Sequence, residues 1–243
     1  MISGKRIREY GFIASFYSVV VGILYLWGYW SSFEVNILEY ISLTDIVKVA
    51  IFPILSSFII FALGAIAGEL MLAGKFPDGG GVNTPTGRFL NKYKDWLLAL
   101  YILCTYLIFL FGQTQKWLIL PLLISIPIST WLRNRGFLQD LIPNGSANRT
   151  IGLLVCALPF YAFGHGIMNA HAIIDGATYQ YVDLDMKKLS FIVSDPEFKD
   201  NKLKFIGVLN NLIFLMPTGG KTIIIAKFDS LEPIALKTYS RAK

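Results

Sequence analysis

The sequence predicts an α-helical multi-pass membrane bundle, of about five spans, followed by a small C-terminal antiparallel β domain. Composition is the first reason, because 54% of the 243 residues are apolar, only 16% are charged and the mean hydropathy is +0.55. Soluble domains carry about 25% charged residues. The second reason is that long apolar runs fill the chain up to residue 176, and the third is that apolar and polar residues alternate after it. We therefore expect a transmembrane helical domain at 1–176 and an extramembrane β-rich head at 177–243.

The apolar runs are long enough to be membrane spans, since a hydrocarbon layer needs about 17 to 25 residues. The first run has bases before it and aromatic residues at its far end, which is typical of a helix that enters from the cytoplasm. Pro121 and Pro127 are expected to kink a later run, which a bilayer tolerates where neighbours satisfy the freed carbonyls. The predicted spans are Phe12–Tyr29, Ile46–Leu72, Trp96–Gly112, Trp117–Leu132 and Ile151–Met168.

The distribution of basic residues predicts the orientation. The N-terminal segment and the loops 74–95 and 133–150 hold most of the bases around the spans, whereas the loops between them on the other side hold only Lys116. Cytoplasmic loops carry the excess of Lys and Arg. We therefore expect a bacterial inner-membrane protein with a cytoplasmic N-terminus and a periplasmic head.

The run Ile151–Met168 allows a second topology. It contains Pro159 and the segment FGHG at 163–166, and such residues also suit a re-entrant or interfacial helix. The chain would then have about four spans, and its head would be cytoplasmic.

The head has the period-two pattern of strands separated by turn residues such as Asn210 and Asn211. We expect an antiparallel sheet in a small barrel or sandwich. A head of about 65 residues is marginal for a core of its own, so it should pack on the helices or on copies of itself. The predicted strands are Tyr179–Leu184, Leu189–Val193, Leu203–Leu209, Leu212–Leu215, Thr222–Phe228 and Ile234–Tyr239.

The sequence carries no hydrolase or HExxH signature in its spans, and we expect neither an enzyme nor a cofactor. The GKT within Pro217–Thr222 lacks the upstream glycine of a phosphate loop and precedes a strand pattern, so it is interpreted as a hairpin turn. Cys104 and Cys156 both lie in apolar runs, where a thiol behaves as a small hydrophobe. Two cysteines so placed predict neither a disulfide framework nor a metal site.

Gly64, Gly68 and Glu69 are the candidate contact residues of the second span. The two glycines form a GxxxG step, which lets another helix approach closely and predicts a homo-oligomer. Glu69 is an acid inside an apolar run, and such residues are candidates for a pore, ion or subunit contact. Alternatively, its carboxylate reaches the headgroups or pairs with Lys75.

His165 and His171 are the only histidines. Because they are six residues apart, they point to different sides of a helix, and each forms an i,i+4 pair instead, with Asn169 and Asp175 respectively. This spacing argues against a shared metal site and favours polar caps near the outer membrane face. A proton-sensing switch is the alternative, since histidine titrates near neutral pH, and a membrane enzyme using either histidine is a further one.

The layout of the whole chain resembles the membrane subunits of Kiwa-type bacterial anti-phage defence systems. Besides the basic start, two segments carry this resemblance. The first ends the first predicted span, GYWSSFEVNILEYISLTD, and the second ends the helical part, FGHGIMNAHAIIDGATYQYV. The resemblance implies an inner-membrane homo-oligomer that senses phage-induced envelope disturbance and docks a soluble cytoplasmic effector. It transfers no functional residue.

Together these features predict a non-enzymatic membrane sensor or scaffold. The net charge of +6 is interpreted as serving orientation and anionic lipid rather than direct nucleic-acid binding, because the bases flank apolar runs. The alternative function is an oligomeric ion-conducting pore with Glu69 near its inner mouth. The basic loops would suit an acidic cytoplasmic protein, and the docking residues we predict are Arg88, Lys92, Lys94, Arg133 and Arg135.

Overall fold

The computed structural model describes residues 4–51, 54–55, 84–114, 116–136, 145–183, 202–227 and 235–240. The helices are α1 (Gly4–Ser31), the 3₁₀ helix η1 (Ile37–Glu39), α3 (Pro85–Lys92), α4 (Lys94–Phe111), α5 (Lys116–Asn134) and α6 (Gly145–Ile174), and residues 43–51 are also helical. The strands are β1 (Thr178–Asp183), β2 (Lys202–Leu209), β3 (Leu212–Pro217), β4 (Ile224–Lys227) and β5 (Leu236–Ser240).

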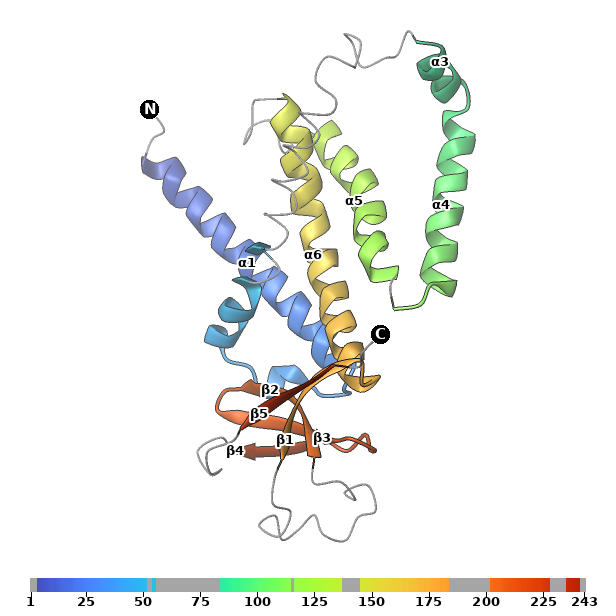
Figure 1. Cartoon of the computed structure of the whole chain (residues 1–243). Helices are drawn as coiled ribbons and strands as arrows, with labels where there is room; N and C mark the ends of the chain where they lie inside the picture. The colour runs from blue at the N-terminus through green and yellow to red at the C-terminus, as the bar shows by residue number, and fades with distance from the viewer. Residues whose placement is uncertain are drawn as a thin grey trace.

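The long helices lie side by side with the sheet at one end of them (Figure 1). Both α1 and α6 end at the sheet, whereas the N-terminus and α3 lie at the opposite end. Within the described ranges, three segments are long and apolar enough to cross a membrane: Gly11–Ser31, Lys94–Phe111 and Ile151–Ile174. The apolar part of α5, Ile119–Leu132, is shorter, and the predicted span Ile46–Leu72 lies largely outside the described residues.

Helix α6 is continuous over 30 residues, a length of about 45 Å, with no reversal at its FGHG segment. Its glycines instead allow close contact with α1. A Cβ on Gly166 would collide with the carbonyl oxygen of Tyr25, and a Cβ on Gly28 would collide with that of Phe163. Small residues at such positions let two helix backbones approach each other, and α1 with α6 forms the most extensive helix pair among the described helices (Figure 1).

Tyrosines satisfy the carbonyl groups that prolines leave free inside two helices. A proline in a helix removes the hydrogen bond to the carbonyl four residues earlier, which is Val155 for Pro159 and Leu123 for Pro127. The hydroxyl of Tyr17 on α1 donates to the Val155 oxygen at 2.7 Å. The hydroxyl of Tyr101 on α4 donates to the Leu123 oxygen. The expectation that neighbouring helices would satisfy a freed carbonyl is thus confirmed at Pro127, and the same arrangement holds at Pro159.

The described strands form one antiparallel sheet of five strands in the order β4-β3-β2-β1-β5. The turn between β2 and β3 consists of Asn210 and Asn211, with φ of 42° and 66°, as a two-residue type I′ hairpin requires. The segment with the GKT joins β3 to β4, which pair antiparallel, so the hairpin interpretation is confirmed. The predicted strand Leu189–Val193 lies outside the described residues.

The prediction of a barrel or sandwich is wrong for these strands, because β4 and β5 are the two edges of an open sheet. The ends of the helices take the place of a second sheet and cover one face. Trp30, Phe33 and Ile37 share one apolar cluster with Ile206 and Phe214 of the sheet. The head therefore packs on the helical bundle, which was one of the two arrangements expected.

Candidate functional site: the junction of the helices and the sheet

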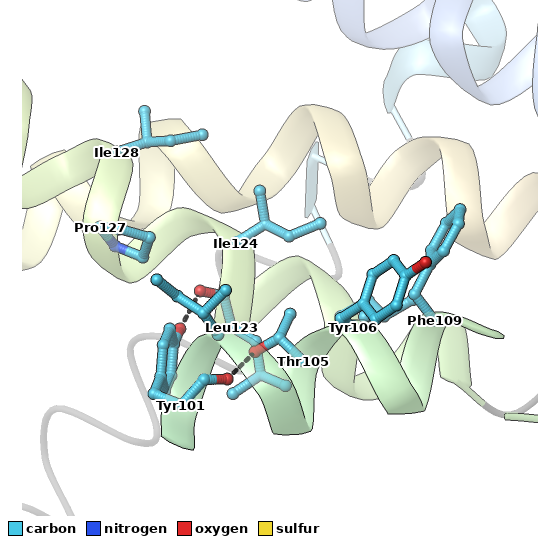
Figure 2. Close-up of a pocket in the computed structure, with 10 residues that line it drawn as sticks. Tyr101, Thr105, Tyr106, Phe109, Leu123, Ile124, Pro127 and Ile128 are labelled. Atoms are coloured by element: carbon cyan, nitrogen blue, oxygen red, sulfur yellow. Dashed lines mark hydrogen bonds between the residues drawn. The ribbon is translucent and has the colours of Figure 1, made fainter. Parts of the chain in front are cut away.

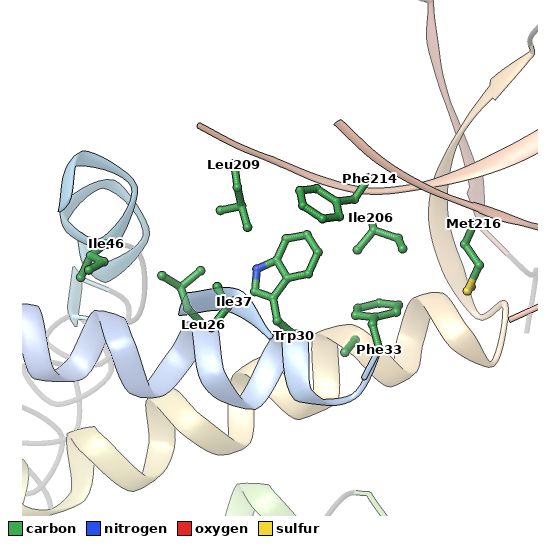
Figure 3. Packing of buried hydrophobic residues seen from close by; sticks show 10 residues of the cluster. Leu26, Trp30, Phe33, Ile37, Ile46, Ile206, Leu209, Phe214 and Met216 are labelled. Atoms are coloured by element: carbon green, nitrogen blue, oxygen red, sulfur yellow. The ribbon is translucent and has the colours of Figure 1, made fainter. Parts of the chain in front are cut away.

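Aromatic side chains at the end of α1 form the centre of the junction (Figure 3). Trp30 is only 2% exposed, and its ring lies edge-on to Phe214 of β3 with the centroids 4.7 Å apart. Tyr40, which follows η1, packs on the same phenylalanine at 5.4 Å. Such edge-to-face pairs are favourable beyond the area they bury, so this cluster fixes the sheet on α1.

Tyr29 binds the sheet through an irregular point of β2. Phe205 and Gly207 pair with successive residues of β3, so that Ile206 forms a bulge without a partner in the ladder. Extra residues in bulges leave backbone groups unpaired. The Tyr29 hydroxyl donates to the Ile206 carbonyl at 2.6 Å, and α1 therefore supplies the hydrogen bond that the sheet lacks there.

Lys204 of β2 binds the end of α6. Its Nζ donates to the carbonyls of Ile173 at 2.9 Å and Ile174 at 3.1 Å, which belong to the last turn of the helix, where carbonyls lose their regular helical partners. The Ile173 carbonyl also accepts from the Gly176 N–H at 3.2 Å. The side chain is 5% exposed. Burial lowers the pKa of Lys204, and the charge of Asp175 opposes that shift.

Asp45 joins a third helix to the same strand pair. Ser42 and Asp45 form a capping box at the start of the helical residues 43–51: the Asp45 N–H donates to Ser42 Oγ, and the Ser42 N–H and Oγ–H donate to Asp45 Oδ2, as in other boxes of this kind. The backbone N–H of Asn210, in the β2–β3 turn, also donates to Oδ2 at 3.2 Å. Burial raises the pKa of Asp45, but the hydrogen bonds from Ser42 and Asn210 and the charge of Lys48 outweigh it, so the pKa is lowered.

The three polar contacts converge on β2 and its turn. Tyr29 belongs to α1, the carbonyls of Ile173 and Ile174 belong to α6, and Asp45 belongs to the helical residues 43–51. The bonds of Tyr29 and Lys204 are part-buried, and removing one partner of such a bond leaves the other poorly satisfied, which makes the loss costly. The bond between Asp45 and Asn210 is exposed. The sheet is therefore held by three helices at once, around one shared core.

The two histidines have separate partners, as their spacing predicts. Asn169 lies 3.2 Å from His165 Nδ1 and donates to the Tyr25 hydroxyl at 3.0 Å. His171 Nδ1 lies 3.9 Å from Asp175 Oδ2. In the described parts of the chain, no three histidine, cysteine, aspartate or glutamate side chains come together in a way that could hold a metal ion. A proton-sensing role for either histidine stays a prediction.

The basic residues predicted to dock a partner lie on α3, α4 and α5, on parts of these helices that lie away from the sheet (Figure 1). Lys92 Nζ lies 5.3 Å from the ring centre of Tyr93, and Arg135 Cζ lies 5.5 Å from that of Trp131. Arg88 lies on α3, Lys94 begins α4, and Arg133 lies within α5. The structure thus places them on neighbouring elements, and their docking role stays a prediction.

Gly64, Gly68 and Glu69 lie outside the described residues. The homo-oligomer contact assigned to the two glycines and the pore or subunit contact assigned to Glu69 therefore stay predictions.

Sequence reasoning missed Tyr29 and Lys204 as junction residues. Lys204 could have been found because it is a lysine inside a strand, two residues before Ile206, which is buried against the helices. This pattern becomes informative only when the end of α6 is known to lie there. Tyr29 has no distinct signal, because aromatic residues at the end of a span are expected for other reasons.

Comparisons of the chain with protein-family models, with curated proteins and with solved structures give no match. The resemblance to Kiwa-type membrane subunits therefore remains a hypothesis, and the function is argued from the junction itself.

Proposed function

We propose that this protein is an oligomeric inner-membrane scaffold that senses disturbance of the bacterial envelope, such as phage infection causes, and transmits it to a soluble cytoplasmic effector. The sheet would be the periplasmic receiving part, and the basic segments at the other end would dock the effector. The observation that carries the proposal is the triple attachment of β2 and its turn to α1, α6 and the helical residues 43–51 around the Trp30 cluster.

Rigid attachment is what a sensor of this kind requires. Packed interiors resist deformation, so a displacement of the sheet moves the helices that share its core. Helix α1 has 28 residues and α6 has 30, which correspond to about 42 and 45 Å. Both exceed a hydrocarbon layer of about 30 Å. A movement at the sheet would thus reach the opposite membrane face along continuous helices.

The test separates attachment from mere membrane insertion. The gene is expressed with its chromosomal neighbours in a susceptible host, and plating efficiency is measured over a panel of phages. We expect wild-type protein to reduce plating and Trp30→Ala to restore it, since loss of a buried tryptophan costs roughly 3–5 kcal/mol. Lys204→Met should restore plating as well, because methionine replaces the apolar stem of the lysine but cannot form its two hydrogen bonds to α6.

Trp27→Ala is the matched control, because Trp27 lies on the same helix and is 58% exposed. It should protect like wild type, at equal protein content in the membrane fraction. The proposal fails if wild-type protein protects against no phage in the panel, or if Trp30→Ala and Lys204→Met protect as well as Trp27→Ala.

A further inference from the structure

Helices α4 and α5 form the two walls of an open apolar groove of about 380 Å³ (Figure 2). Ile102 and Phe109 line it from α4, and Ile124 and Ile128 line it from α5. Two hydroxyl groups on the lining residues already have hydrogen-bond partners. The Tyr101 hydroxyl donates to the Leu123 carbonyl, and the Thr105 hydroxyl donates to the Tyr101 carbonyl at 2.8 Å. These bonds leave the groove suited to a hydrocarbon ligand.

The groove is open because α4 has few contacts with the rest of the described chain. None of the residues of α4 is buried, and in Figure 1 the helix stands apart from α1 and α6. The bond from Tyr101 to the carbonyl freed by Pro127 ties α4 to the middle of α5. On the opposite wall, Leu120 is almost completely buried.

Basic residues lie at one end of this helix pair. Because α4 and α5 form a hairpin, the start of α4 and the end of α5 lie at the same end, which carries Lys92, Lys94 and Arg135. Tyr93 and Trp131 lie beneath two of these charges, and aromatic residues beside bases are typical of the headgroup layer. This end therefore matches an anionic headgroup.

The spacing along α4 fits one leaflet. Tyr101 lies seven residues after Lys94, or about 10 Å, and Phe109 lies about 12 Å further along the helix. A leaflet of hydrocarbon is about 15 Å thick below a headgroup layer of several ångströms. The groove thus lies at the depth of an acyl chain whose headgroup is level with the bases.

We infer that the α4–α5 groove holds one acyl chain of an anionic phospholipid whose headgroup contacts Lys92 and Lys94. A helix of a second copy in the same orientation is disfavoured there, because it would bring like charges together at the basic end of the helix pair. The inference rests on the membrane insertion of α4 that the proposed function assumes, and not on envelope sensing.

The experiment uses full-length protein in nanodiscs with phosphatidylglycerol that carries a photoreactive group at the middle of its acyl chain. Labelled residues are mapped by mass spectrometry. We expect labelling at Ile102, Tyr106 and Ile124, with phosphatidylglycerol competing better than phosphatidylcholine. In a Lys92→Ala, Lys94→Ala variant that advantage should fall roughly 30-fold, as expected for two bases beside an anionic headgroup.

Two variants fill the groove from opposite walls, Ile102→Trp and Ile124→Trp, and each should abolish the labelling. The matched control is Leu98→Trp, which is also on α4, is 53% exposed and does not line the groove. It should leave the labelling unchanged. Uniform labelling around α4 that neither filling variant alters would overturn the inference and indicate bulk lipid only. Cross-links between two copies at the groove, formed equally without the lipid, would overturn it in favour of a subunit contact.

Extraction with alkaline carbonate distinguishes failure of the lipid site from failure of membrane insertion. A chain that carbonate removes from membranes contradicts membrane insertion, and with it the proposed function. A chain that resists carbonate but shows no specific labelling contradicts the lipid site alone.

Discussion

Asp45 shows how one carboxylate can belong to two parts of the molecule. It closes the capping box with Ser42 and accepts a hydrogen bond from the turn residue Asn210. Hydrogen bonds to a carboxylate are stronger than those between neutral groups. The pattern Ser-x-x-Asp predicts the cap from the sequence, but the contact with Asn210, 165 residues away, depends on the tertiary fold.

The lowered pKa of Asp45 predicts how stability depends on pH at the junction. A carboxylate whose pKa lies below its ordinary value of 3.8 in the folded protein contributes stability above that value and loses it as pH falls through the folded pKa. Asp45→Asn should therefore lower the thermal stability of the purified protein at pH 7, by about 1 kcal/mol. The difference from wild type should shrink as the pH falls below 3.8 and through the lowered pKa of Asp45.

Thermal unfolding in detergent at a series of pH values measures this difference. Asp95→Asn, at the other end of the molecule, controls for acid effects unrelated to the junction. A gap between wild type and Asp45→Asn that stays constant from pH 7 to the acid limit would refute a role for the charge.

At the scale of helices and strands, periodicity and run length predicted most elements, because both follow from local chemistry. The hairpin at Asn210 and Asn211 is an example, since two asparagines adopt the positive φ that its turn needs. The prediction of a barrel was wrong because residues outside the head determine whether the sheet closes or stays open. The apolar residue Phe214 faces the sequence-distant Trp30, and no pattern within the strands identifies that partner.

The pairing of tyrosines with prolines makes a further prediction for the helices. Tyr17→Phe should destabilise the protein by about 1–3 kcal/mol, because it leaves the Val155 carbonyl without a donor in surroundings without water. In a Pro159→Ala background the backbone N–H at position 159 can donate to Val155, so the same change should cost less. A double-mutant cycle should give a coupling of about 1 kcal/mol.

The cycle is measured by reversible unfolding in mixed detergent, and Tyr101 with Pro127 provides an independent repeat. Tyr106→Phe is the control, because this exposed tyrosine lies on the same helix as Tyr101 and faces no proline-freed carbonyl. Additive effects within both cycles would show that the hydroxyl groups do not replace the missing helical bonds.

For the whole molecule, the two ends of the helices determine the topology. The N-terminus, α3 and the beginning of α6 lie at one end, and the sheet lies at the other (Figure 1). If Gly11–Ser31 crosses the membrane, the sheet must lie on the side opposite to the N-terminus, whichever way the N-terminus faces. The bias of basic residues then favours a periplasmic sheet.

Cysteine accessibility tests this arrangement in intact cells. In a background of Cys104→Ala and Cys156→Ala, a membrane-impermeant maleimide should modify Val208→Cys, on an exposed part of β2, without permeabilisation. Arg135→Cys, at the basic end, should react only after permeabilisation. A cytosolic fluorescent reporter fused after Lys243 should remain dark for the same reason. If both cysteines react from the same side, α1 does not separate the sheet from the basic end. The sheet could then no longer transmit an outer stimulus to an inner partner, because stimulus and partner would lie in one compartment.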